Sequence, residues 1–240
     1  MNNIIIIIPT LNEKKNIKIL FDKLTTTNIR FDLLFIDDNS SDGSQEIIKD
    51  LAKNNQNINY IFRPKKMGIG SAHKDGFIWA YKKNYKIIIT MDVDGTHDPK
   101  YLKCLIEELK NSDIVVTNRF LEKNLLENWP LFRIFLTRAR HLLISLFLSM
   151  SYDASGAFRS IDCKKVILSD LILAKNNSYA YFWESIFILH KKKYRIGQIP
   201  ISLPWRIVGS SKMTMKDIFV SISYLMIVFL KKILGKYNFK

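Results

Sequence analysis

Two aspartates, Asp92 and Asp94, stand one residue apart in the segment MDVDGTHDP (91–99), directly after an apolar run. The run is typical of a buried strand, and Gly95 marks a turn in which both carboxylates can converge on one point. A hard divalent cation takes one or two carboxylates and completes its shell with phosphate oxygens and water. Because Asp and Gly are also common in ordinary turns, these residues alone leave a metal site and a plain turn both open.

Arginines in the second half of the chain are candidate anion ligands. A guanidinium group forms paired hydrogen bonds with phosphate that lysine cannot match. From Arg206 to Lys212, two cations flank a Gly-Ser-Ser turn, which suits either a mobile clamp over an anionic substrate or a solvated basic loop. The arginines concerned are Arg119, Arg133, Arg159 and Arg206.

Two loops of the first half carry further polar candidates. Asp38 could accept hydrogen bonds from a ribose hydroxyl or a base N–H, while Ser41 or Asp42 could cap the following helix. The basic loop 63–70 contains two glycines and could bind phosphate. Its spacing fits neither a dinucleotide-binding fingerprint nor a P-loop, which disfavours a Rossmann dehydrogenase.

Two carboxylates of the second half, Asp153 and Glu184, lie beside aromatic residues in the sequence. Either could orient an arginine, bind sugar hydroxyls or act as a base, and a structural ion pair is the default for each. The four histidines form no recognisable metal set, so we expect packing or surface roles for all of them. They are His73, His97, His141 and His190.

Strand-like and helix-like segments alternate through the first half of the chain. The fully apolar, β-branched run Ile4–Ile8 is typical of a strand buried on both faces. The βαβα order implies an α/β fold with a mostly parallel sheet, helices on both faces, and ligands at the carboxyl ends of the strands. Expected strands are 4–8, 31–36, 58–62, 87–91 and 114–117; expected helices are 12–26, 44–53, 71–83 and 99–110.

The alternation fails after residue 120. Helices are expected over 131–150 and 179–191, and the uncharged segment 218–230 is followed by Lys231 and Lys232. Thirteen helical residues reach roughly 20 Å, short of the ~30 Å hydrocarbon core of a bilayer. This segment therefore fits an interfacial membrane helix or, alternatively, a core helix. We accordingly expect a catalytic domain over 1–213 and a basic, apolar C-terminal helix over 214–240.

Composition narrows the classes of protein further. The chain has 240 residues, of which 48% are hydrophobic, which fits one folded domain with or without an appendage and excludes a disordered chain. The two cysteines have no metal or redox spacing and fit a reducing compartment. The N-terminus lacks a basic n-region, and its apolar run stops at Pro9, so we expect no signal peptide.

The charge is strongly positive and unevenly spread. The formal net charge is +15, and residues 185–240 hold eleven Lys or Arg but only one acid, Asp217. Such a field concentrates nucleotide phosphates, nucleic acid or an anionic membrane, although a lysine-rich proteome would give a similar total. Since no nucleic-acid-binding motif is recognisable, we expect no nucleic-acid partner.

Taken in order, nine motifs resemble glycosyltransferase family 2, and within it the polyprenyl-phosphate (dolichol-phosphate) mannosyltransferase group. They span residues 9 to 213. They are PTLNE (9–13), DDNSSDGS (37–44), KMGIGSAHKDGF (66–77), MDVDGTHDP (91–99), NR (118–119), WPLFR (129–133), DASGAFR (153–159), FWE (182–184) and IPISLPWRIVGSSKM (199–213).

The resemblance implies a GT-A type, Rossmann-like fold and a nucleotide-sugar donor. Leu11 stands where tyrosine is common, which implies weaker base stacking, and Thr96 stands where Gln or Ser often completes the metal shell. We expect no extended multi-helix membrane tail of the kind that some relatives carry. The implied sites are Pro9, Leu11, Glu13, Ile36 and Asp38 for base and ribose, Val93 against the nucleotide, Asp92, Asp94 and Thr96 for Mg²⁺ or Mn²⁺, and Arg119, Arg133, Arg206 and Lys212 for donor and acceptor phosphates.

The implied reaction is inverting transfer of a hexose, in the first place mannose from GDP-mannose, to a polyprenyl phosphate at the cytoplasmic face of a membrane. An acceptor phosphate is already anionic and needs no strong base, whereas a sugar hydroxyl would need one, with Glu184 or Asp153 as candidates. The alternatives are another donor such as UDP-glucose, a glycan acceptor, or a non-catalytic module that binds polyanions or membranes. A membrane-protein partner is left open.

Overall fold

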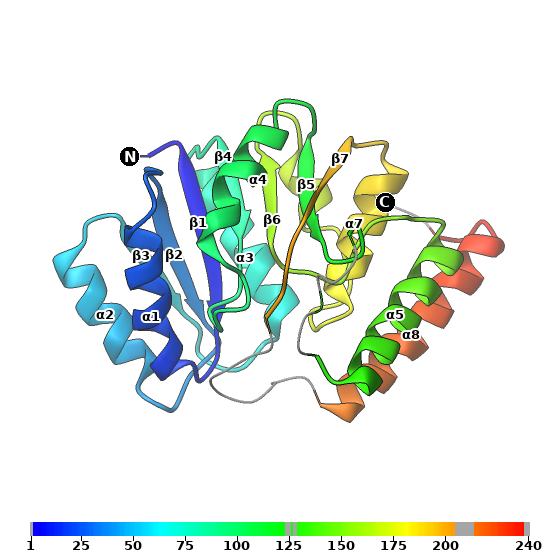
Figure 1. Cartoon of the computed structure of the whole chain (residues 1–240), viewed down its shortest axis with the longest axis horizontal. Helices are drawn as coiled ribbons and strands as arrows, with labels where there is room; N and C mark the ends of the chain where they lie inside the picture. Colours follow the sequence, from blue (N-terminus) through cyan, green and yellow to red (C-terminus); the bar gives the residue numbers. More distant parts are fainter. Residues whose placement is uncertain (1, 123–125, 127–128, 205–213, 238–240) are drawn as a thin grey trace.

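The computed structural model describes residues 2–122, 126, 129–204 and 214–237. A single seven-stranded sheet runs through its centre, in the order β3-β2-β1-β4-β6-β5-β7 (Figure 1). All neighbouring strands are parallel except β6, which runs antiparallel to both β4 and β5. The strands are β1 (Ile4–Thr10), β2 (Asp32–Asp37), β3 (Ile58–Phe62), β4 (Ile87–Thr90), β5 (Ile114–Asn118), β6 (Arg159–Asp162) and β7 (Ile196–Pro200).

Helices cover both faces of this sheet, as the βαβα order predicts. They are α1 (Lys14–Thr25), α2 (Ser44–Asn54), α3 (Ile69–Lys82), the short η1 (Pro99–Tyr101), α4 (Leu102–Glu108), α5 (Leu131–Leu148), α6 (Leu168–Leu171), α7 (Tyr181–Lys191) and α8 (Met215–Ile233).

Strand β1 explains why the sheet has two cores. Successive side chains of a strand point to opposite faces. Ile6 and Ile8 pack with residues of α1, α2 and α4. Ile5 and Ile7 pack on the other face with residues of α3, α6 and α7. A continuous isoleucine run is therefore required here, since neither face of this central strand meets water.

The mostly parallel sheet and its first five strands are confirmed, but two strands were missed. The short strand β6 begins with Arg159 and contains a single apolar residue, Ile161, so it lacks the apolar run of a central strand. It nevertheless lies between β4 and β5, and it is buried. Because β6 runs antiparallel, the segment before it arrives at the edge where the parallel strands end.

Helices α5 and α8 lie side by side at one end of the molecule (Figure 1). Helix α8 lies within the predicted 214–240, includes the uncharged segment 218–230 and begins with a capping box, in which Thr214 and Asp217 bond each other's backbone N–H. Within the described residues, no helix combines the length and the apolarity needed to cross a bilayer. The division at residue 213 stays a prediction.

Candidate active site

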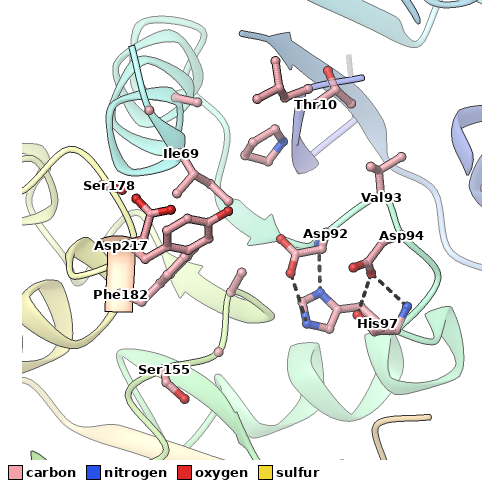
Figure 2. A pocket seen from close by; sticks show the side chains of 18 of the residues that line it. Thr10, Ile69, Asp92, Val93, Asp94, His97, Ser155, Ser178, Phe182 and Asp217 are labelled. Carbon is pink, nitrogen blue, oxygen red and sulfur yellow. Dashed lines mark hydrogen bonds and ion pairs between the residues drawn. The ribbon is translucent and has the colours of Figure 1, made fainter. Parts of the chain in front are cut away.

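A cavity of about 390 Å³ lies at the edge of the sheet where the parallel strands end. Strand-end loops form one side of it. The side chains of α5, α7 and α8 and the segment before β6 form the other (Figure 2). The predicted site residues among its lining are Pro9, Leu11, Glu13, Asp38, Asp92, Val93, Asp94, Thr96 and Arg119.

The loop after β4 holds Asp92 through a buried histidine. The backbone N–H of Asp92 donates to Nδ1 of His97 over 2.8 Å, and Nε2 of His97 lies 3.8 Å from the Asp92 carboxylate (Figure 2). The imidazole stacks on Phe158 with 4.9 Å between ring centroids. Burial lowers the pKa of His97 to about 4, with Asp94 opposing and Arg119 adding to this effect. His97 is thus a neutral residue that positions Asp92. This agrees with the packing or surface role expected from the sequence.

Asp94 is oriented by its own turn. Its Oδ1 accepts hydrogen bonds from the Thr96 hydroxyl (2.6 Å) and from the Thr96 backbone N–H (3.1 Å). Gly95 between them has a φ of +80°, a left-handed conformation that favours glycine. Both Asp92 and Asp94 are partly exposed to the cavity. Both thus lie at the same cavity just after the end of β4.

The donor set fits a hard cation that is shared with a substrate. Asp92 and Asp94 supply carboxylate oxygens, and the Thr96 hydroxyl lies beside them. Within the described part of the chain, no cluster of three or more His, Cys, Asp or Glu side chains could hold a metal by itself. Two carboxylates suit Mg²⁺ or Mn²⁺ completed by phosphate oxygens and water, and they suit zinc poorly.

Asp38 organises the loop that follows β3. Its carboxylate accepts from Arg63 Nη1 (2.8 Å) and from the backbone N–H groups of Met67 (2.8 Å) and Gly68 (2.9 Å). The next N–H groups, of Gly70 and Ser71, donate to the Asn177 carbonyl. These N–H groups are therefore already hydrogen-bonded within the protein. They cannot also bind a phosphate, as was considered for residues 63–70.

The N-terminal motif lies beside Asp38 at the same edge. Pro9, Leu11 and Glu13 line the cavity, and Glu13 accepts from Asn16 Nδ2 over 2.5 Å. Ile36 differs from expectation: it is completely buried in the core on the α3 side of the sheet and does not line the cavity. The physical reason is the position of the strand end: Ile36 lies within β2, where α3 covers it, whereas Asp38 lies beyond the last residue of the strand.

Two arginines lie near one buried carboxylate, Asp153: Arg119, which follows β5, bonds it directly, and Arg140 of α5 is connected to it through Ser155. Arg119 Nε donates to Asp153 over 2.6 Å, and Ser155 Oγ, which donates to Asp153, accepts from Arg140 Nη2 over 3.0 Å. Burial and the nearby Arg119 lower the pKa of Arg140 to about 10, so it stays charged at neutral pH. Both arginines line the cavity, which leaves this corner with a net positive charge.

Sequence reasoning missed Arg140, although a signal for it exists. Thr137, Ile144 and Leu148 form the buried face of α5. Arg140 follows Thr137 by three residues and therefore belongs to the same helical face. An arginine on the inner face of an amphipathic helix calls for a buried partner or a ligand.

Arg159 and Glu184 have structural roles. The guanidinium of Arg159 donates to three backbone carbonyls and to the Ser185 hydroxyl. Glu184 is completely buried and accepts from the backbone N–H of Asn176 (2.9 Å) and from two tyrosine hydroxyls near the C-terminus. Those hydroxyls belong to Tyr224 (2.7 Å) and Tyr237 (3.0 Å), so Glu184 fastens α8 to α7.

Helix α8 itself forms part of the cavity wall. Asp217 and Ser221 line it, and Asp217 lies across the cavity from Asp92 (Figure 2). Trp183 lines it as well and donates from Nε1 to Ser221 Oγ over 3.2 Å. The C-terminal helix is thus a component of the site, which its apolar sequence did not indicate.

Three further phosphate ligands were predicted, and only one of them, Arg133, lies within the described residues. Arg206 and Lys212 lie outside the described residues. Arg133 is exposed on α5 and is not among the residues that line the cavity.

Comparison with known proteins gives consistent matches. The family model for glycosyl transferase family 2 matches residues 5–166. The undecaprenyl-phosphate mannosyltransferase of Micrococcus luteus is 27% identical over 212 residues, which cover 88% of this chain and 87% of that protein. The polyprenol monophosphomannose synthase of Mycolicibacterium smegmatis is 24% identical over 217 residues, covering 89% and 82%.

Solved structures share the fold. Glucosyl-3-phosphoglycerate synthase from Mycobacterium tuberculosis, crystallised with Mn²⁺, UDP and glucosyl-3-phosphoglycerate, superposes with a TM-score of 0.64 at 15% identity. The match covers 98% of this chain and 81% of that one. The expected GT-A type of α/β fold is confirmed.

Proposed function

Since the chain belongs to glycosyl transferase family 2, we propose that it transfers a hexose from a nucleotide-sugar donor to a polyprenyl phosphate, with inversion at the anomeric carbon. Mannose from GDP-mannose is the first choice. The names of the two curated relatives, both polyprenyl-phosphate mannose enzymes, support this choice. Membership of a transferase family argues against the alternative of a non-catalytic polyanion-binding module.

The observation that carries the proposal is the meeting of opposite charges in one cavity. Asp92 and Asp94 line it after the end of β4, Arg119 lines it directly after the end of β5, and Arg140 reaches it from α5. A donor diphosphate needs both kinds of group, because a cation bridges it to carboxylates while arginines take its remaining charge. A polyanion-binding surface would gain nothing from the carboxylates.

We assign the donor to the strand-end side. Pro9, Leu11, Glu13 and Asp38 would contact the base and ribose, with Val93 against the nucleotide. In this assignment Ile36 supports the pocket from within the core and makes no direct contact. Arg206, Lys212 and Arg133 are kept as proposed phosphate ligands.

Asp92 and Asp94, with Thr96 beside Asp94, would hold Mg²⁺ or Mn²⁺. When bound, such a cation offsets the charge that develops on the departing diphosphate. The Mn²⁺ in the structural relative supports this class of metal. Within the chain, His97 fixes the backbone of Asp92 and Thr96 fixes the carboxylate of Asp94, so both ligands are oriented in advance.

The surroundings of the two candidate bases, Asp153 and Glu184, support a phosphate acceptor. Burial alone would raise the pKa of Asp153, but Arg119, Ser155 and Arg140 outweigh this effect and hold the pKa below its usual value. Glu184 already accepts three hydrogen bonds and does not line the cavity. Neither carboxylate suits proton abstraction from a sugar hydroxyl, whereas a phosphate oxygen attacks without losing a proton.

The proposed location is the cytoplasmic face of a membrane, where a polyprenyl phosphate resides. The exposed apolar side chains of α8 and the lysines at its end support peripheral attachment through this helix. Attachment through a partner protein is the alternative.

The first test is a transfer assay with radiolabelled GDP-mannose and UDP-glucose, a polyprenyl phosphate, and Mg²⁺ or Mn²⁺. We expect label in the organic phase with one donor only, the mannose donor. Metal-dependent nucleotide binding without lipid-linked label would redirect the search to a glycan acceptor. Absence of nucleotide binding with either metal would contradict the proposal.

A matched pair of variants tests whether Asp92 is needed for sugar transfer. Asp92→Asn removes a proposed metal ligand and should lower transfer roughly a hundredfold or more. Asp98→Asn is the control, because Asp98 only caps the short helix η1 through Lys100 and does not line the cavity. Equal losses in both variants would speak against a special role for Asp92.

A further inference from the structure

Helix α8 brings a carboxylate to the active-site cavity. Asp217 belongs to the first turn of α8 and lines the cavity across from Asp92 (Figure 2). Its Oδ2 accepts hydrogen bonds from the backbone N–H of Thr214 (2.8 Å) and from the Thr214 hydroxyl (2.7 Å). Its Oδ1 accepts no hydrogen bond from the described residues. The helix cap therefore uses one carboxylate oxygen, and the other is available to a ligand.

This carboxylate is ionised at neutral pH. The hydrogen bond from the Thr214 backbone lowers the pKa of Asp217 against the opposing effect of burial. Lys66, which also lines the cavity, adds to the lowering. A negative charge in a substrate cavity restricts which part of a substrate can lie beside it, because it attracts hydrogen-bond donors and repels anions.

The charge of Asp217 disfavours contact with most parts of the proposed substrates. The donor diphosphate and the acceptor phosphate are anions, which a carboxylate repels. The polyprenyl chain is apolar and offers no hydrogen bond to a buried charge. The base and the ribose are assigned to the strand-end side, across the cavity. The hydroxyl groups of the transferred hexose are neutral donors, and a hydrogen bond from a hydroxyl to a carboxylate is charge-assisted.

Other lining residues on this side of the cavity also suit a sugar. Ser178 and Ser221 contribute hydroxyl groups. Ser221 Oγ accepts from Trp183 Nε1 over 3.2 Å, so its own proton is available for donation. Phe182 and Trp183 add aromatic rings, which suit the apolar C–H groups of a pyranose. A few polar groups among aromatic side chains are typical of a small-molecule site.

The position of the hexose follows from the groups that it joins. Asp92 and Asp94 would hold the donor diphosphate, and Arg119 and Arg140 line the same cavity of about 390 Å³. The hexose is bonded to the diphosphate and is attacked by the acceptor phosphate, so it must lie in front of the two carboxylates. Since the sheet lies behind them, at the end of β4, the hexose extends toward the side on which Asp217 lies (Figure 2).

We propose that Asp217, together with Ser221 one turn further along α8, binds hydroxyl groups of the transferred hexose. The carboxylate accepts from one hydroxyl, and the serine donates to another. The proposal deepens the proposed function and rests on it for the class of donor, a nucleotide sugar. It gives the first turns of the C-terminal helix a direct part in substrate recognition.

The test compares binding of a nucleotide sugar with binding of the nucleotide alone. Calorimetry with Mn²⁺ gives the affinities for GDP-mannose and GDP, and for UDP-glucose and UDP. Asp217→Asn keeps an oxygen for the Thr214 cap and removes the charged acceptor. We expect the affinity for the nucleotide sugar to fall about ten- to a hundredfold, because a hydrogen bond to a charged group is lost. The affinity for the free nucleoside diphosphate should change less than about twofold, since only the hexose contact is removed.

Thr214→Val is the matched control for the helix cap. Thr214 is exposed and does not line the cavity. Its replacement should lower the Tm more than Asp217→Asn does, because the capping hydroxyl is lost, and should leave all affinities unchanged. Ser221→Ala should weaken binding of the nucleotide sugar roughly fivefold and leave binding of the free nucleotide unchanged.

Deoxy analogues of the donor that binds identify the hydroxyl concerned. In the native protein, the analogue that lacks this hydroxyl should bind about as weakly as the complete donor binds to Asp217→Asn. The same analogue should lose nothing further in the variant, because both changes remove one hydrogen bond. If the effects of Asp217→Asn and of every deoxy analogue simply add, the carboxylate does not contact the hexose.

Several other outcomes would overturn the inference. Equal affinity of the native protein and Asp217→Asn for the nucleotide sugar would refute the hexose contact and leave the proposed function standing. Equal losses for the nucleotide sugar and the free nucleotide would show a general disturbance of the cavity. A lower kcat with unchanged donor affinity would make the carboxylate a base. Native protein that binds neither pair of ligands would instead contradict the proposed function itself.

Discussion

On the strand-end side of the cavity, the site residues directly follow strands of the sheet. On the helix side, a small number of side chains hold the helices against the rest of the protein. Asp92 follows β4, a strand paired on both edges, and its backbone is held by a histidine stacked in the core. On the helix side, Asp217 and Ser221 depend on α8, which Glu184 and Lys232 fasten. One side is preorganised by strand pairing, while the other depends on a few side-chain contacts between helices.

The contacts that hold α8 offer the strongest test of this difference between the two sides. Glu184→Gln replaces a buried carboxylate that accepts three hydrogen bonds by an amide. The N–H₂ group of this amide would face hydrogen-bond donors and could not accept from them. We expect a loss of roughly 2–3 kcal/mol in the free energy of unfolding. Hydrogen exchange should quicken in α8 more than in β4, and nucleotide affinity should change little.

The conservative comparison for this prediction is Tyr224→Phe, which removes one hydroxyl and keeps the ring beside Trp183. It should cost about 1 kcal/mol in unfolding free energy. Equal acceleration of exchange in β4 and α8 would show that the two sides are not separable.

Arg140 tests whether the helix side receives the acceptor. Arg140→Met keeps much of the apolar stem and removes the charge, so the acceptor KM should rise about ten- to a hundredfold, from roughly 1.5–3 kcal/mol of charged hydrogen bonding. The donor KM should stay near its original value. Assays in detergent with a short-chain polyprenyl phosphate separate this effect from membrane binding.

Arg138→Met is the matched control, because Arg138 lies exposed on the same helix and does not line the cavity. It should leave both KM values unchanged in detergent. A rise in the donor KM of the Arg140 variant would move this arginine to the donor side.

A substitution of Thr96 tests how the metal ligand Asp94 is oriented on the strand-end side. It is expected to have the smallest effect of the three. If its hydroxyl orients Asp94, Thr96→Val should weaken metal affinity by about 1 kcal/mol, close to fivefold, and Thr96→Ser should restore it. Metal affinity can be followed by the Mn²⁺ dependence of nucleotide binding. A loss far above tenfold in the Val variant would indicate direct ligation by Thr96.

The strand-end side was predictable because its signals are local. Apolar β-branched runs mark the buried strands, and in parallel strands the residues that follow must meet at one edge. Asp38, Asp92 and Asp94 were found in this way. Ile36, which the resemblance assigned to the pocket, instead lies in the core, because it is still within β2 whereas the cavity begins beyond the end of that strand.

The helix side was not predictable to the same degree, because its signals are not local. Strand β6 has too few apolar residues to be recognised, and its place between β4 and β5 depends on pairings with segments far away in the chain. Arg140 and Ser221 become site residues only through the packing of α5 and α8. The stabilising partners of Glu184 lie 40 and 53 residues further along the chain.

The central place of β6 has a consequence for biosynthesis. While the chain emerges from the ribosome, β1 to β4 can pair among themselves, but β4 remains an open edge until residues 159–162 arrive. An unpaired apolar strand such as 87–90 is prone to pair with other chains. The nascent protein therefore passes through a stage at which aggregation competes with completion of the sheet. A chaperone would be most useful between translation of β4 and translation of β6.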